Sequence, residues 1–126
     1  MWRSFLQWVG DFAAVAWALP ALEVDRRRVG LGPLISRLRQ RGRKARRRCE
    51  TGRARLRRVV WWVDQMIPGS PNCYRRVLLQ IRSDAGFAEQ PVHLGLMADG
   101  APRSGHIWLA DEPQSPSISY DAQIIL

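Results

Sequence analysis

The chain has 126 residues and a formal net charge of +9, from 20 Lys or Arg against 11 Asp or Glu. This length allows one domain with a modest core. The hydrophobic content of 46% excludes a wholly disordered chain, and two cysteines do not make a disulfide framework. The charge is uneven: residues 26–58, here called the Arg-rich segment, hold 15 basic groups and one acidic group, whereas the rest holds 5 basic and 10 acidic groups. The Arg-rich segment indicates acidic or phosphate-bearing partners.

Apolar residues recur near the N-terminus with the spacing of an amphipathic helix, which we expect to end at Pro20. They are Phe5, Leu6, Val9, Phe12, Ala13 and Ala16. The uncharged run from Phe12 to Leu22 has 11 residues, well short of the roughly 18 that indicate a membrane span. A secretion signal is the alternative, but only Arg3 supplies positive charge before the apolar run. We therefore expect a cytoplasmic protein.

The middle of the chain predicts a bend followed by a weak and then a strong helical pattern. Pro20, glycines and an Arg triplet make residues 20–33 a bend between elements. Gly42 and Gly52 weaken any long helix through the Arg-rich segment. The helical pattern then recovers, ends at Pro68-Gly69, and places six residues on one face: Leu56, Val59, Val60, Val63, Met66 and Ile67.

The second half predicts one more helix and then an antiparallel sheet. Ser70-Pro71 is typical of a helix start, with Ser70 as N-cap, and an apolar face then leads to an end near Ser83 to Gly86. Three runs of strand character follow, over 91–98, 105–111 and 118–126. The expected fold class is α+β. We expect a helical region over residues 1–67 and a catalytic core over 68–126, within one compact domain.

Three residues could form a catalytic constellation. Cys73 falls in the first turn of the helix after Ser70, where unpaired N–H groups and the helix dipole stabilise a thiolate. His106 lies on a strand and is the best candidate base. Asp121 lies on the next strand along the chain, and an adjacent antiparallel strand could place its carboxylate beside the imidazole.

Each of these residues has an ordinary alternative explanation. A cysteine at a helix start is more often a small buried residue, and His106 and Asp121 could be packed or solvent-facing strand residues. The order of Cys on a helix and then His and Asp on successive strands is what papain-like and transglutaminase-like proteins share. We interpret Cys49 as an incidental thiol and His93 as an ordinary sheet residue that could border the cleft.

A specific resemblance covers the second half of the chain. Residues 56–110 resemble the leader peptidase of lasso peptide maturation, a small transglutaminase-like cysteine protease. The matching features are an Arg-Arg-Val-Val helix, Pro68-Gly69, Asn72-Cys73 with an Arg/Leu-rich helix, and the run Gly105-His106-Ile107-Trp108-Leu109. Chain length is similar to the split form of the enzyme, in which a separate protein recognises the precursor.

The resemblance implies a site and a set of partners. Cys73 matches the nucleophile and His106 the base; Asp121 is the preferred third member, with Asp111 and Glu112 as nearer alternatives. The implied partners are the leader of a precursor peptide, a small leader-recognition protein and the lasso cyclase. ATP is expected only for that cyclase, since this chain carries no phosphate-binding motif, and neither a cofactor nor a metal is expected.

Two other functions stay open as alternatives, together with an inactive relative of the peptidase. The Arg-rich segment could bind nucleic acid, although aromatic residues do not interleave with the arginines and the acidic C-terminal half would repel a duplex. A helix bearing Trp2, Phe5 and Trp8 together with the Arg-rich segment could instead hold the protein at a membrane. Trp61 and Trp62 are expected to divide between the core and a contact surface.

Overall fold

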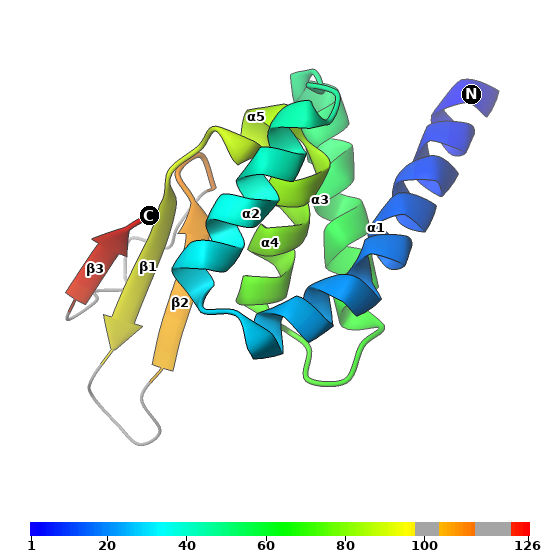
Figure 1. Cartoon of the computed structure of the whole chain (residues 1–126). Coiled ribbons are helices and arrows are strands. Elements are labelled where there is room, and N and C mark those ends of the chain that lie inside the picture. The colour runs from blue at the N-terminus through cyan, green and yellow to red at the C-terminus, as the bar shows by residue number, and fades with distance from the viewer. Residues whose placement is uncertain (98–103, 113–121) are drawn as a thin grey trace. The chain divides into compact units, whose positions relative to one another are not determined.

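A computed structural model describes residues 1–97, 104–112 and 122–126 (Figure 1). The described part confirms an α+β protein, in which helices precede a small antiparallel sheet. The helices are α1 (Trp2–Arg28), α2 (Leu31–Lys44), α3 (Glu50–Gln65), α4 (Cys73–Ser83) and α5 (Ala85–Ala88). The strands are β1 (Val92–Met97), β2 (Ser104–Leu109) and β3 (Ala122–Ile125).

The chain divides into two compact units, a helical unit over Met1–Glu89 and a strand unit over Gln90–Leu126. The boundary expected between residues 67 and 68 is not the boundary between these two units. The helix that carries Cys73 belongs to the helical unit, because α4 packs against α1, α2, α3 and α5.

The first helix does not end at Pro20. Helix α1 continues to Arg28, with Pro20 inside it, and it bends along its length (Figure 1). A proline within a helix removes one backbone hydrogen bond and produces a kink, but packing on both sides of the kink can keep the helix continuous. The expected bend over residues 20–33 is therefore confined to the short connection at Val29 and Gly30.

The face that α1 buries is not the predicted apolar stripe. Its buried residues are Asp11, Val15, Ala18 and Leu22, whereas Phe5, Leu6, Val9 and Phe12 are all exposed. The reason is an ion-pair cluster: Asp11 accepts hydrogen bonds from Arg48 Nη1 at 2.6 Å and Arg55 Nε at 2.8 Å, and this turns its side of α1 toward the bundle. Within the described residues, α1 alone is long and apolar enough to cross a membrane, judged by length and composition.

Glycine permits a helix in the Arg-rich segment rather than preventing one. Helix α2 runs through Gly42, and a Cβ atom there would lie 1.9 Å from the Ile81 carbonyl oxygen and 2.8 Å from the Ala88 Cβ. Only glycine allows α2 to approach α4 and α5 so closely. Gly52 lies in the first turn of α3, where it does not interrupt the helix.

The predicted face of α3 is largely confirmed. Leu56, Val59, Val60 and Val63 are all buried. Met66 is exposed because α3 ends at Gln65.

The start of α4 lies two residues later than expected. Asn72, not Ser70, is the N-cap: its Oδ1 accepts a hydrogen bond from the Arg75 N–H at 3.1 Å. The helix ends at Ser83, as predicted, and the Asp84 side chain then caps α5 through the Phe87 N–H at 3.0 Å.

The sheet has the strand order β2-β1-β3, with both pairs antiparallel. The central strand is therefore β1, and β3 does not neighbour β2. Residues that lie opposite one another share a face, and faces alternate along each strand. The register places both histidines on one face, here called the histidine face, which includes His93, Gly95, His106, Trp108, Gln123 and Ile125.

Candidate functional site

Cys73 is the first residue of α4, directly after the Asn72 cap. Its thiol is free and half-buried. Asn72 provides acceptors for the Arg75 and Arg76 N–H groups, through its side chain and its carbonyl oxygen. Within the described part of the chain, no acceptor faces the backbone N–H of Cys73, as is usual for the first position of a helix. A half-buried thiol beside an unused N–H is an arrangement that can attack a carbonyl and hold the resulting oxyanion.

Tyr74 follows Cys73 in α4. Burial raises the pKa of Tyr74 above its ordinary value, and the charge of Cys73 raises it further. The hydroxyl therefore stays protonated at neutral pH. Tyr74 also lines a cavity of about 240 Å³ with Arg26, Val29, Leu31, Leu34 and Leu78.

A buried charge network holds the start of α4 in place. The Arg75 side chain is 4% exposed, and it donates to Glu23 Oε1 of α1 and to Asp64 Oδ1 of α3, both at 2.7 Å. Asp64 is fully buried, and its second oxygen accepts the Asn72 N–H at 3.1 Å. The residue before Cys73 is thereby fixed to α3, and the residue two positions after Cys73 is fixed to both α1 and α3.

The same network borders a cavity of about 400 Å³ in the helical unit. Its lining combines the turn before α4 with the C-terminal part of α1: Glu23, Val24, Arg26, Arg27, Ile67, Pro68, Gly69, Asn72 and Arg75. The pKa of Glu23 lies below its ordinary value. Burial alone would raise it, but hydrogen bonds from Arg75 and Arg26 together outweigh that effect. Glu23 is therefore ionised at neutral pH.

His106 lies on the histidine face of the sheet, in contact with an aromatic neighbour. The ring of Trp108 makes stacked contacts with two imidazoles, its centroid lying 5.5 Å from that of His106 and 5.6 Å from that of His93. Trp108 is 7% exposed. Stacking on a rigid indole restricts the orientation of the His106 ring, which is useful in a general base.

His93 and Trp108 are the residues that sequence reasoning undervalued. The sequence does show that these residues can share a face, because His93 and Gly95 are two positions apart on one strand and His106 and Trp108 are two positions apart on another. A sequence alone does not give the register that sets His93 opposite Trp108.

The choice of Asp121 as the third catalytic residue depends on the order of the strands. Asp121 lies outside the described residues, but the strand that follows it, β3, pairs with β1 and not with the strand of His106. The role of Asp121 as the third catalytic residue therefore stays a prediction, made on an adjacency of strands that β2 and β3 do not have. In the described sheet, Gln123 is in the same row as His106, with Gly95 between them on β1.

The alternative acids lie in the turn after β2. Asp111 is exposed, and its backbone N–H donates to Gln90 Oε1 at 3.4 Å. Glu112 is half-buried, and the structure shows no hydrogen-bond partner for its Oε2 among the residues it describes.

The proposed nucleophile and base belong to different units. Cys73 is in the helical unit and His106 in the strand unit, so the approach of the thiol to the imidazole stays a prediction. Cys49, the other thiol, is exposed at the N-cap of α3. It lines a cavity of about 830 Å³ that Asp11 and four arginines also border.

No group of three His, Cys, Asp or Glu side chains that could hold a metal occurs among the described residues. In comparisons with known proteins, no family model, curated protein or solved structure matches this chain.

Proposed function

We propose that the protein is a cysteine peptidase that removes the leader from a ribosomally made lasso peptide precursor. It would work with a separate leader-recognition protein and a cyclase, and its core would be transglutaminase-like. The observation that carries the proposal is Cys73 at the first position of α4, half-buried and beside an unused backbone N–H. The resemblance of residues 56–110 to the leader peptidases adds the reaction and the partners.

The chemistry follows from the roles of the two side chains. His106 takes the thiol proton, and the Cys73 thiolate attacks the carbonyl carbon of the bond between leader and core. The Cys73 N–H stabilises the oxyanion that forms. As the C–N bond breaks, His106 returns its proton to the leaving amine of the core. The leader stays on sulfur as a thioester until water, deprotonated by His106, releases it as a carboxylate and regenerates the thiol.

The Arg-rich segment supports this proposal over nucleic-acid binding, because several of its arginines serve internal ion pairs. Arg48 and Arg55 both pair with Asp11, and Arg47 pairs with Glu89. Arginines held in this way contribute less to a surface that neutralises phosphates.

The test is cleavage of a leader-bearing precursor in the presence of its recognition protein, followed by mass spectrometry. Cys73→Ala should abolish the two products, a free leader and a core with a new amine. Cys49→Ala is the matched control, since it removes the other thiol, and it should cleave at the wild-type rate. Undiminished cleavage by Cys73→Ala, or no cleavage by the wild type, would contradict the proposal.

A further inference from the structure

Helix α1 exposes an apolar face that points away from the helical unit. The buried residues of α1 are at positions 11, 15, 18 and 22. Subtracting nine from each gives a second set of residues on the same helix, at positions 2, 6, 9 and 13. Nine residues at about 100° each amount to about two and a half turns, so these two sets lie on opposite sides of α1. The outer set consists of Trp2, Leu6, Val9 and Ala13.

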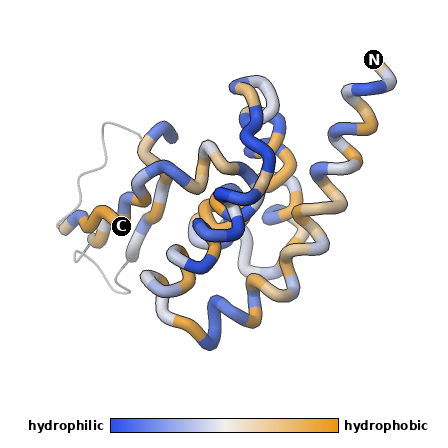
Figure 2. Tube along the Cα trace, turned by 45° about the horizontal axis from the view of Figure 1, so that its top comes forward, coloured by the Kyte–Doolittle hydropathy of each residue, from blue (hydrophilic) through white to orange (hydrophobic). Residues whose placement is uncertain are grey.

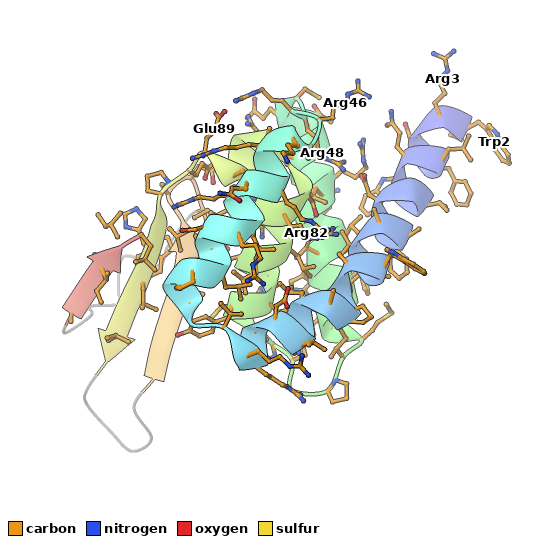
Figure 3. All side chains as sticks on the ribbon, in the orientation of Figure 1. Trp2, Arg3, Arg46, Arg48, Arg82 and Glu89 are labelled. Carbon is orange, nitrogen blue, oxygen red and sulfur yellow. The ribbon has the colours of Figure 1, made fainter. Side chains whose placement is uncertain are left out.

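More large side chains extend this outer face. Trp2 is 73% exposed and Trp17 87%, and Phe5, Leu6, Val9, Phe12 and Val24 are also exposed. Hydrophobic residues recur along α1 from the N-terminus (Figure 2). The Trp2 side chain projects from the end of the helix away from the other helices (Figure 3). Soluble monomers seldom expose so many large apolar side chains on one element, so this face indicates a binding partner.

The charges around the outer face identify the kind of partner. All three acidic residues of α1 are engaged by arginines: Asp11 by Arg48 and Arg55, Glu23 by Arg26 and Arg75, and Asp25 by Arg37. Positive charge flanks the face at both ends of the helix, at Arg3 and at the exposed pair Arg27 and Arg28. An apolar face with arginines at its ends and no free carboxylate is complementary to an anionic lipid surface.

The shape of the face agrees with a lipid partner. It is one side of a single helix, and none of the cavities described above is lined by Trp2, Leu6, Val9 or Trp17. Two of its largest side chains are tryptophans, which favour the boundary between headgroups and acyl chains. The opposite face stays packed in the helical unit through Val15, Ala18 and Leu22, so α1 would lie along the membrane and not cross it.

We propose that α1 docks the protein onto anionic phospholipid membranes by inserting its outer face, Trp2 to Trp17, at the interface. This inference does not depend on the peptidase activity. It is tested with the full chain by co-sedimentation with vesicles of phosphatidylcholine alone and with a quarter of phosphatidylglycerol. We expect binding to the mixed vesicles, weaker binding to the neutral ones, and a blue shift of tryptophan fluorescence on binding.

Two variants that add the same charge separate insertion from simple attraction. Val9→Glu places a carboxylate in the outer face and should weaken binding about tenfold or more, because the contact between the valine side chain and the membrane interior is lost. Gln40→Glu adds the same charge at an exposed position of α2 and should stay within about twofold of the wild type. Equal losses in both variants, or no binding to either kind of vesicle, would overturn the proposal. The proposal would also be overturned if the protein does not bind vesicles but forms dimers in solution, and if Val9→Glu dissociates these dimers.

Discussion

Replacing Arg75 by methionine removes a guanidinium that joins α1, α3 and α4. Methionine keeps most of the apolar stem, so the change isolates the charge. The substitution leaves the Asp64 carboxylate fully buried, with the Asn72 N–H at 3.1 Å and Arg76 Nε at 3.7 Å as its remaining partners. Removing one partner of a buried pair costs about 3–5 kcal/mol.

The two remaining contacts place the expected loss for Arg75→Met at the lower end of this range, about 3 kcal/mol in the free energy of unfolding. For a chain of this size, such a loss lowers the midpoint of thermal unfolding by roughly 10 °C. Urea denaturation followed by circular dichroism measures the loss directly. Arg58→Met is the matched control, because Arg58 is exposed on α3; it should change the stability by less than about 0.5 kcal/mol. A loss below about 1 kcal/mol for Arg75→Met would refute the claim that this network anchors α4.

Three further changes test other parts of the helical unit by the same denaturation assay. Gly42→Ala should cost about 1–3 kcal/mol, because its Cβ would meet the Ile81 carbonyl oxygen at 1.9 Å, whereas Gly32→Ala, which meets nothing within 4 Å, should not destabilise. Asp84→Ala should cost about 2 kcal/mol, since a buried carboxylate that accepts two backbone N–H groups is lost; a cost near zero would show that these bonds contribute nothing. Because the folded pKa of Glu23 is lowered, its contribution is complete above the ordinary glutamate pKa and is lost as the pH falls through the folded value. The wild type should therefore exceed Glu23→Gln in stability at pH 7 and lose that advantage as the pH is lowered through the folded pKa of Glu23, and an advantage independent of pH would contradict the ion pair.

Local patterns in the sequence predicted much of the secondary structure. The spacing of Leu56, Val59, Val60 and Val63 identified the buried face of α3, and strand-like runs were placed correctly for β1 and β2. These features depend on residues that are close in sequence, and hydrophobic periodicity reports them well.

The orientation of α1 and the order of the strands could not be predicted in this way. The orientation depends on Asp11 meeting Arg48 and Arg55, 37 and 44 residues away, and periodicity does not say which of two faces finds a partner. The sheet places β1 between β2 and β3. This spatial order does not follow from the order in which the strands occur along the chain. The expected adjacency of the last two strands fails for this reason, since it assumed that successive strands are neighbours.

The buried network around Arg75 was also missed. Arg75 contacts Glu23, which is 52 residues away, and an arginine in an Arg-rich chain gives no local sign that it is buried. Of the proposed site, the sequence identified Cys73 and His106 as candidates. It gave no indication of the stacking that orients His106 or of the contacts that hold Asn72.

The most direct test of the proposed peptidase labels its nucleophile with a substrate-like reagent. A leader peptide that ends in a chloromethyl ketone alkylates an activated thiol with loss of chloride, and peptide mapping by mass spectrometry locates the adduct. We predict rapid labelling of Cys73 in the presence of the recognition protein, strongly slowed labelling in His106→Ala, and little labelling of Cys49. Equal labelling of both cysteines, or labelling of Cys73 that does not depend on His106, would contradict the account.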